Sequence, residues 1–136
     1  MRKKNSACIL KSNHKFGFTL IEILVVLAII ATLLSLVAPR YFTTIDRSKE
    51  ATLRHDLAVM RDAIDKFYSD NNAYPESLDD LVQHKYLRQI PPDPITESIE
   101  TWTFTAPSDI NIKGTIADIH SGSENTAANG TPYASW

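Results

Sequence analysis

The chain has little of the chemistry on which most enzymes and metal proteins depend. Cys8 is the single cysteine among 136 residues, which excludes both a CxxC motif and an intrachain disulfide. The sequence contains no glycine-rich phosphate loop and no nucleophile elbow. The four histidines, His14, His55, His84 and His120, show no spacing typical of metal ligands. We therefore predict that the chain is not an enzyme.

Acidic residues are absent from the first 17 positions. All sixteen Asp and Glu lie after Gly17, together with nine of the fourteen Lys and Arg, so the remainder has a side-chain net charge of −7. This acidic body argues against nonspecific binding to nucleic acid, which requires positive charge. The first 17 residues are basic instead, and such a stretch remains on the cytoplasmic side of a membrane. Its basic residues are Arg2, Lys3, Lys4, Lys11, His14 and Lys15.

A long apolar run follows the basic stretch. It spans the 21 residues from Phe18 to Ala38, about 30 Å of helix, which matches one bilayer core. A secretory signal has a shorter apolar core with a cleavage site after it, whereas here a small residue, Gly17, precedes the core. Glu22 places a charge at membrane depth, where it costs a few kcal/mol and indicates function. The run is therefore either a plain signal anchor or a prepilin-type signal.

The residues Gly17-Phe18-Thr19-Leu20-Ile21-Glu22 favour the second interpretation. They resemble the processing site of type IV pilins and type II secretion pseudopilins. The resemblance implies that an aspartyl prepilin peptidase cuts between Gly17 and Phe18 and then N-methylates Phe18. It also implies that Glu22, the fifth residue of the mature chain, acts in subunit assembly.

Beyond Pro39 the sequence predicts a second helical segment, which is amphipathic. Apolar residues recur at helical spacing, which predicts a helix over about 42–69, continuous or nearly so with the membrane helix. Pro39 predicts a kink or local melting between the two. The apolar stripe comprises Leu53, Leu57, Met60, Ile64, Phe67 and Tyr68, and the predicted i,i+4 ion pairs are Glu50/Arg54, Arg61/Asp65 and Asp62/Lys66.

The rest of the chain predicts short elements. Asp70-Asn71-Asn72 ends the long helix, and Ser77 caps a short second helix in which Asp80 completes a capping box. The connector at 90–94 is rich in proline and is not a strand. The last third predicts β-structure, from Trp102 to Thr105 and in part through Ile110, Ile112, Ile116 and Ile119, with turns at 106–109 and 113–114. A polar loop at 121–130 then precedes Tyr133 and Trp136, which are expected to pin the tail to the domain.

Several segments beyond the long helix also resemble the G-type pseudopilin domain. The similar segments are Tyr74-Pro75, Asp93-Pro94, the strand with Trp102, the residues 118–121 and the residues 133–136. Many G-type members carry a calcium site in the C-terminal loop. Calcium requires six to eight oxygen ligands, and here only Asp118 and Glu124 supply carboxylates. We therefore expect no cofactor, with calcium at these two residues as the alternative.

Together these features predict an α+β, pilin-like fold, with a long N-terminal helix and a small antiparallel sheet domain. The expected parts are a removed leader (1–17), a transmembrane and assembly helix (18–39) and a periplasmic globular domain (40–136). The resemblance implies a structural subunit of a type II secretion pseudopilus, anchored in the bacterial inner membrane and polymerising into a periplasmic filament. Its implied partners are further copies, other pseudopilins, prepilin peptidase, and the assembly platform with its ATPase. The alternatives are a type IV or competence pilus subunit and, from another class, a signal-anchored periplasmic binding protein or enzyme.

Overall fold

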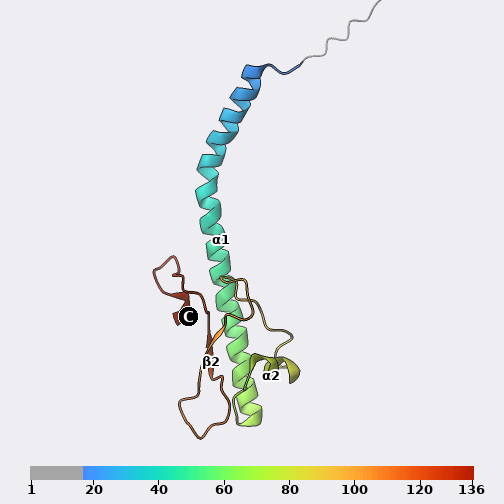
Figure 1. Cartoon of the computed structure of the whole chain (residues 1–136), viewed down its shortest axis with the longest axis vertical. Helices are drawn as coiled ribbons and strands as arrows, with labels where there is room; N and C mark the ends of the chain where they lie inside the picture. The colour runs from blue at the N-terminus through green and yellow to red at the C-terminus, as the bar shows by residue number, and fades with distance from the viewer. Residues whose placement is uncertain (1–16) are drawn as a thin grey trace, which may run out of the picture. The chain divides into compact units, whose positions relative to one another are not determined.

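The computed structural model describes residues 17–136 and contains one dominant helix with several short elements (Figure 1). The leader before Gly17, with Cys8 and His14, lies outside the described residues. The elements in chain order are α1 (Leu20–Asn71), α2 (Leu78–Gln83), β1 (Thr103–Thr105), β2 (Asp118–His120) and a 3₁₀ turn, η1 (Tyr133–Ser135). The chain divides into two compact units, Met1–Pro39 and Arg40–Trp136. This α+β arrangement confirms the predicted fold class.

Helix α1 contains both segments that the sequence predicts to be helical. Its 52 residues remain helical through Pro39, which confirms the predicted continuity; of the two outcomes predicted at Pro39, a kink or local melting, melting does not occur. A proline removes only one backbone donor, and the hydroxyls of Thr43 and Thr44, just beyond it, each donate to the Arg40 carbonyl at 2.9 Å without interrupting the helix. The helix ends as predicted, because Asn72 adopts a left-handed conformation (φ 55°) that asparagine tolerates.

Helix α2 is short and is fixed by its N-terminal cap. The Ser77 hydroxyl accepts a hydrogen bond from the Asp80 N–H at 3.3 Å, and the Asp80 carboxylate accepts from the Ser77 N–H at 3.0 Å. This reciprocal pair is the capping box that the sequence predicts. Leu78 and Leu81 are buried, so the cap sets the direction in which α2 presents its apolar side to the core.

The sheet is a single antiparallel pair. Thr103, Phe104 and Thr105 of β1 face His120, Ile119 and Asp118 of β2, in that order. The prediction that Ile110 and Ile112 belong to a strand is wrong. The Asp109 carbonyl accepts from the Ile112 N–H at 3.1 Å, which closes a turn, and Ile110 is 97% exposed. Alternation alone did not reveal that Asp109 also accepts from the Asn111 N–H, which favours the turn over the strand.

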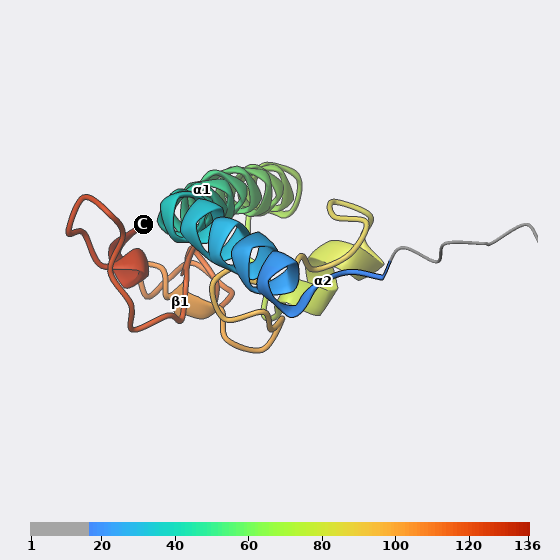
Figure 2. The ribbon, with the colours of Figure 1, turned by 90° about the horizontal axis from the view of Figure 1, so that it is seen from above.

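One hydrophobic core holds the second unit together. In Figure 2, α2, β1 and the C-terminal segment lie on one side of the second half of α1. The predicted helical stripe is confirmed, since five of its six residues are buried and Tyr68 stacks on Tyr74 with ring centres 4.5 Å apart. Each such buried side chain stabilises the fold by about 1.5–3 kcal/mol. The core residues are Leu53, Leu57, Met60, Ala63, Ile64, Phe67, Leu78, Leu81, Leu87, Trp102, Ile116, Ile119, Ala127 and Tyr133.

Only one of the three ion pairs predicted along α1 forms. Lys66 and Asp62 lie 2.7 Å apart, as predicted. The predicted Arg61/Asp65 and Glu50/Arg54 pairs are wrong, because Arg61 pairs with Asp118 of β2 and Glu50 accepts hydrogen bonds from the C-terminal segment. Tertiary partners replaced the local ones, and helical spacing cannot reveal such partners.

Candidate functional site

The start of α1 brings together the residues of the predicted processing and assembly site. Gly17, Phe18 and Thr19 precede the helix, and Glu22 lies in its first turn. The Glu22 N–H donates to the Thr19 hydroxyl at 3.2 Å, and the Glu22 carboxylate accepts from the Thr19 N–H at 3.4 Å. These two bonds form a second capping box, in which Thr19 is the N-cap. Glu22 therefore stabilises the N-terminus of α1 in addition to carrying a charge.

Gly17 is not required by the fold. A Cβ atom built at this position meets no other atom within 4 Å. A larger side chain would therefore not clash with the described chain. The described residues therefore give no steric reason for glycine at this position.

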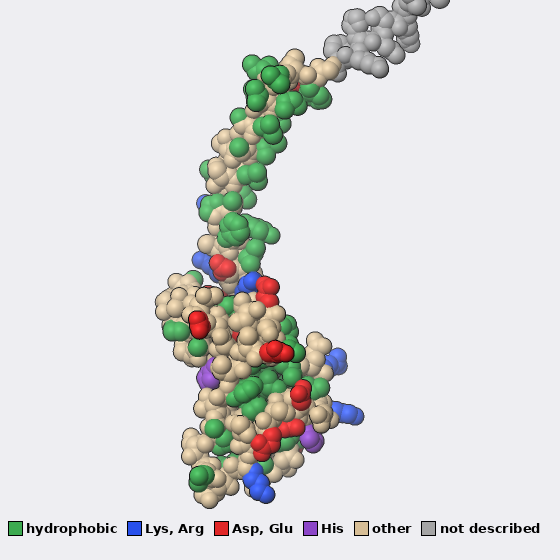
Figure 3. Space-filling model, in the orientation of Figure 1, with side chains coloured by type: hydrophobic (Ala, Val, Ile, Leu, Met, Phe, Trp, Pro, Cys, Tyr) green, Lys and Arg blue, Asp and Glu red, His purple; other side chains and the backbone are tan. Residues whose placement is uncertain are grey.

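The first part of α1 exposes its apolar side chains on every side. Leu20 is 82% exposed, and none of the residues 18–39 is buried (Figure 3). The Thr32 hydroxyl donates to the Ala28 carbonyl at 2.7 Å and the Ser35 hydroxyl to the Thr32 carbonyl at 2.8 Å, so neither hydroxyl needs water. Among residues 17–136, α1 is the one helix long and apolar enough to cross a membrane. Of the four polar side chains in this run, Glu22 is the one that brings a charge.

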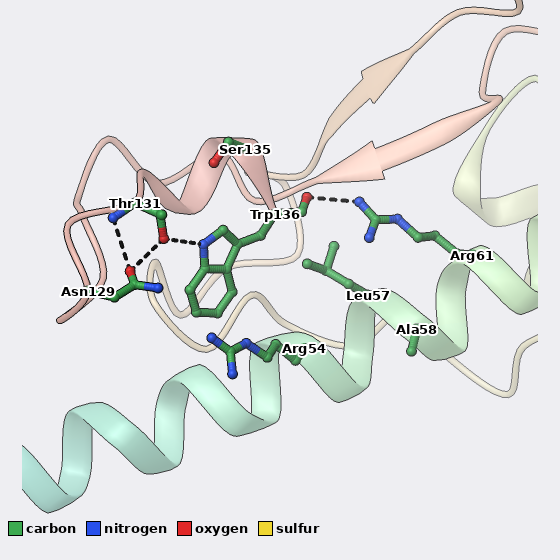
Figure 4. A pocket seen from close by; sticks show the side chains of 8 residues that line it. All are labelled: Arg54, Leu57, Ala58, Arg61, Asn129, Thr131, Ser135 and Trp136. Carbon is green, nitrogen blue, oxygen red and sulfur yellow. Dashed lines mark hydrogen bonds between the residues drawn. The ribbon is translucent and has the colours of Figure 1, made fainter.

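A second group of functional interest fixes the C-terminal segment to α1. We call Arg61, Asp118, His120 and Trp136 the tail lock. The Arg61 guanidinium donates through Nε to the Asp118 carboxylate at 2.7 Å and through Nη2 to the main-chain oxygens of Ile119 at 2.9 Å and Trp136 at 2.8 Å (Figure 4). The His120 ring nitrogen Nδ1 lies 2.6 Å from the same Trp136 oxygen. One arginine thus joins α1, β2 and the tail.

The tail lock shifts the titration of Asp118. Burial alone would raise the pKa of this carboxyl, but the Ile119 N–H, the Arg61 guanidinium and His120 together hold it below its ordinary value. A carboxyl with a lowered pKa stabilises the fold above the unfolded-state pKa. Its contribution is lost as the pH falls through the lowered value, so the lock is intact at neutral pH and weakens only in acid.

Asp118 and Glu124, the two residues of the alternative calcium site, belong to no group of three potential metal ligands among residues 17–136. Asp118 is engaged by Arg61, whereas Glu124 is exposed in the loop beyond β2. Within residues 17–136, no three His, Cys, Asp or Glu side chains lie close enough to hold a metal ion together. The loop is instead fixed by Glu50, whose carboxylate accepts from the Ala128 N–H and from the Tyr133 hydroxyl, both at 3.0 Å.

Sequence reasoning missed several of these residues. The Thr19/Glu22 capping box could have been found, since Thr-x-x-Glu before an apolar run is its signature. The roles of Glu50, Arg61 and His120 could not, because their partners lie 78, 57 and 16 residues away along the chain. No local pattern in a single sequence identifies such partners.

The tail lock leads to a stability prediction. Replacing Arg61 by Met should lower the free energy of unfolding of a Tyr41–Trp136 fragment by about 1–3 kcal/mol, because a charged donor with three partners is lost. The matched control is Lys66→Met, which removes an exposed i,i+4 pair and should cost less than about 0.5 kcal/mol. Urea unfolding of both variants measures the difference, and equal losses would show that the lock adds nothing.

Comparison with known proteins identifies relatives of this chain and a family motif at its N-terminal end. Residues 12–38 match the family described as the prokaryotic N-terminal methylation motif, and the matched range includes Gly17, Phe18 and Glu22. The type II secretion system core protein G of Pseudomonas aeruginosa is 32% identical over 101 residues, which cover 62% of this chain and 71% of the relative. The protein of the same name from Vibrio cholerae is 28% identical over 139 residues, covering 87% of this chain and 91% of the relative. No solved structure matches significantly.

Proposed function

We propose, since this chain belongs to the family of type II secretion system core protein G, that it is a structural subunit of a pseudopilus. Membership of this family implies the general role of a membrane-anchored subunit that assembles with other subunits. The observation that carries it for this chain is the first part of α1, whose apolar side chains have no partner within the subunit. Such a surface is stable only in lipid or against other helices of its kind.

The proposed orientation rests on the cluster of basic residues before the apolar run. The basic leader favours a cytoplasmic N-terminus, which would place residues 40–136 in the periplasm. We further propose that prepilin peptidase removes residues 1–17 and methylates Phe18. An assembly platform and its ATPase would then move the mature subunit from the membrane into the filament. In this account the chain is the substrate of an enzyme and not itself one.

A clean deletion tests the function. Loss of protein export, with twitching and transformation unchanged, is the expected result, because the relatives are named for secretion. Complementation with the wild-type gene should restore export. Loss of twitching or of transformation with normal export would instead assign the chain to a type IV or competence pilus.

We also propose that the globular domain does not depend on calcium. Glu50 fixes the 124–133 loop and Arg61 engages Asp118, so the protein supplies internally the contacts that a cation would otherwise make. A Tyr41–Trp136 fragment should therefore be folded, soluble and monomeric without added calcium. Thermal unfolding with calcium and with chelator measures this. A melting temperature that calcium raises by several degrees and chelator lowers again would contradict the proposal by ligand linkage.

A further inference from the structure

A groove lies on the globular domain between α1 and the C-terminal segment. Its volume is about 600 Å³, and all its lining residues belong to the unit Arg40–Trp136. Arg54 supplies a positive charge, the Arg61 guanidinium is already paired with Asp118, and Leu57, Ala58 and the Trp136 ring supply apolar surface (Figure 4). Neither the helix packing nor the proposed membrane anchor accounts for this combination.

Arg54 is held in place but has no hydrogen-bond acceptor among residues 17–136. Its guanidinium carbon lies 4.3 Å from the centre of the Trp136 ring, a cation–π contact. The ring is itself fixed, because its Nε1–H donates to the Thr131 hydroxyl at 2.9 Å. Within residues 17–136 no carboxylate or carbonyl accepts a hydrogen bond from Arg54, so its donors remain available to a ligand.

This arrangement suits a carboxylate next to an apolar side chain. A stacked guanidinium offers parallel N–H donors that match the two oxygens of a carboxylate. The fixed Trp136 ring reduces the entropy lost on binding, because Arg54 is already ordered. The floor formed by Leu57 and Ala58 would accept an aliphatic group beside the carboxylate.

The surface of the same chain presents a segment with a carboxylate next to an apolar side chain. Ile99 is 51% exposed, and the adjacent Glu100 is exposed with no described partner for its carboxylate. The turn before them is rigid, because the Asp93 carboxylate accepts from the Ile95 N–H at 2.8 Å and the Ser98 carbonyl accepts from the Asp93 N–H at 3.0 Å. Ile99 and Glu100 are therefore presented on a fixed support.

We infer that this groove binds the Ile99-Glu100 segment of a second copy of the chain. The inference rests on the proposed function, because a filament of identical subunits requires two different complementary surfaces on each subunit. Arg54 and Glu100 form the complementary charges, and Ile99 fills the apolar floor. The side-chain net charge of −7 after Gly17 makes repulsion between copies the default, so the unpaired charge of Arg54 gives the contact its orientation.

Charge reversal in the full-length chain, expressed in its own cells, tests the contact. Arg54→Glu alone and Glu100→Arg alone should each lower the yield of periplasmic filaments, isolated after the outer membrane is opened, at least about tenfold, the effect of about 1.4 kcal/mol lost per contact. The double variant should recover most of the yield. Lys66→Glu, which makes the same charge change on α1 outside the groove, should have little effect.

Cysteine cross-linking gives a second readout that does not depend on the stability of the charge variants. The mature chain would contain no native cysteine, so Ala58→Cys combined with Ile99→Cys should yield a ladder of disulfide-linked multimers, and neither single variant should. The inference is overturned if wild-type filaments form while the double cysteine variant gives no ladder, or if the reversed charge pair does not recover assembly. Absence of wild-type filaments would instead contradict the proposed function.

Discussion

Replacing Glu22 by Gln should leave the precursor cleaved and inserted but abolish filament assembly. Gln retains the hydrogen bond to the Thr19 N–H, so the capping box and the start of α1 are preserved. Only the charge is lost. In the filament we expect this charge to compensate the methylated N-terminal amine of Phe18 on a neighbouring subunit. A buried charge left without its partner costs about 3–5 kcal/mol, which is enough to prevent polymerisation.

The measurement is an immunoblot of filaments released from the periplasm and of the inner-membrane fraction. Mature Glu22→Gln protein should accumulate in the membrane and be absent from the filament fraction. Thr19→Ala is the matched control, because it weakens the same cap by about 1 kcal/mol and leaves the charge intact. Normal filaments from Glu22→Gln would contradict a role of the charge in assembly. Loss of cleavage in Glu22→Gln would show that the peptidase recognises the Glu22 carboxylate.

The second large effect is expected at Gly17. Gly17→Leu should prevent cleavage, so that the full-length precursor remains in the membrane. The cause lies in the peptidase and not in the fold, since no described atom lies within 4 Å of a Cβ at this position. Gly17→Ala, which adds a single methyl group, should be cleaved more slowly than wild type but faster than Gly17→Leu. The ratio of precursor to mature protein on immunoblots measures this order, and wild-type processing of Gly17→Leu would refute it.

A block at Gly17 also predicts a block in assembly. Without cleavage no free amine forms at Phe18, so Glu22 of the neighbouring subunit lacks its proposed partner. Gly17→Leu and Glu22→Gln should therefore give the same absence of filaments but different precursor states. This difference separates processing from assembly.

The parts of the fold that the sequence predicted are those determined by local interactions. The length of α1, its end at Asn71, the capping box of Ser77 and Asp80 and the buried stripe all follow from spacing along one helix or turn. The Thr19/Glu22 box belongs to the same class and was overlooked. The capping residues therefore could all be found without a structure.

Two predicted ion pairs were wrong because of partners distant in the sequence, and one predicted strand was wrong because of a local turn. Arg61 has Asp65 available at i+4 but pairs with Asp118, which is joined to it only when β2 packs near α1. Glu50 likewise accepts a hydrogen bond from the Tyr133 hydroxyl instead of pairing with Arg54. Ile110 and Ile112 alternate like a strand, yet the Asp109 turn places them in a loop. The groove between α1 and the C-terminal segment depends on long-range contacts such as those of Arg61 and Glu50, so it could not be predicted from the sequence.

The central claim is that the chain is a prepilin-type precursor whose functional N-terminus is Phe18. Mass spectrometry of the N-terminal peptide, from protein purified out of the native membrane, tests it most directly. The expected spectrum is that of a chain that begins at Phe18 with one added methyl group on its amine. A mature N-terminus near Ala38, or an uncut chain in cells with active prepilin peptidase, would contradict it.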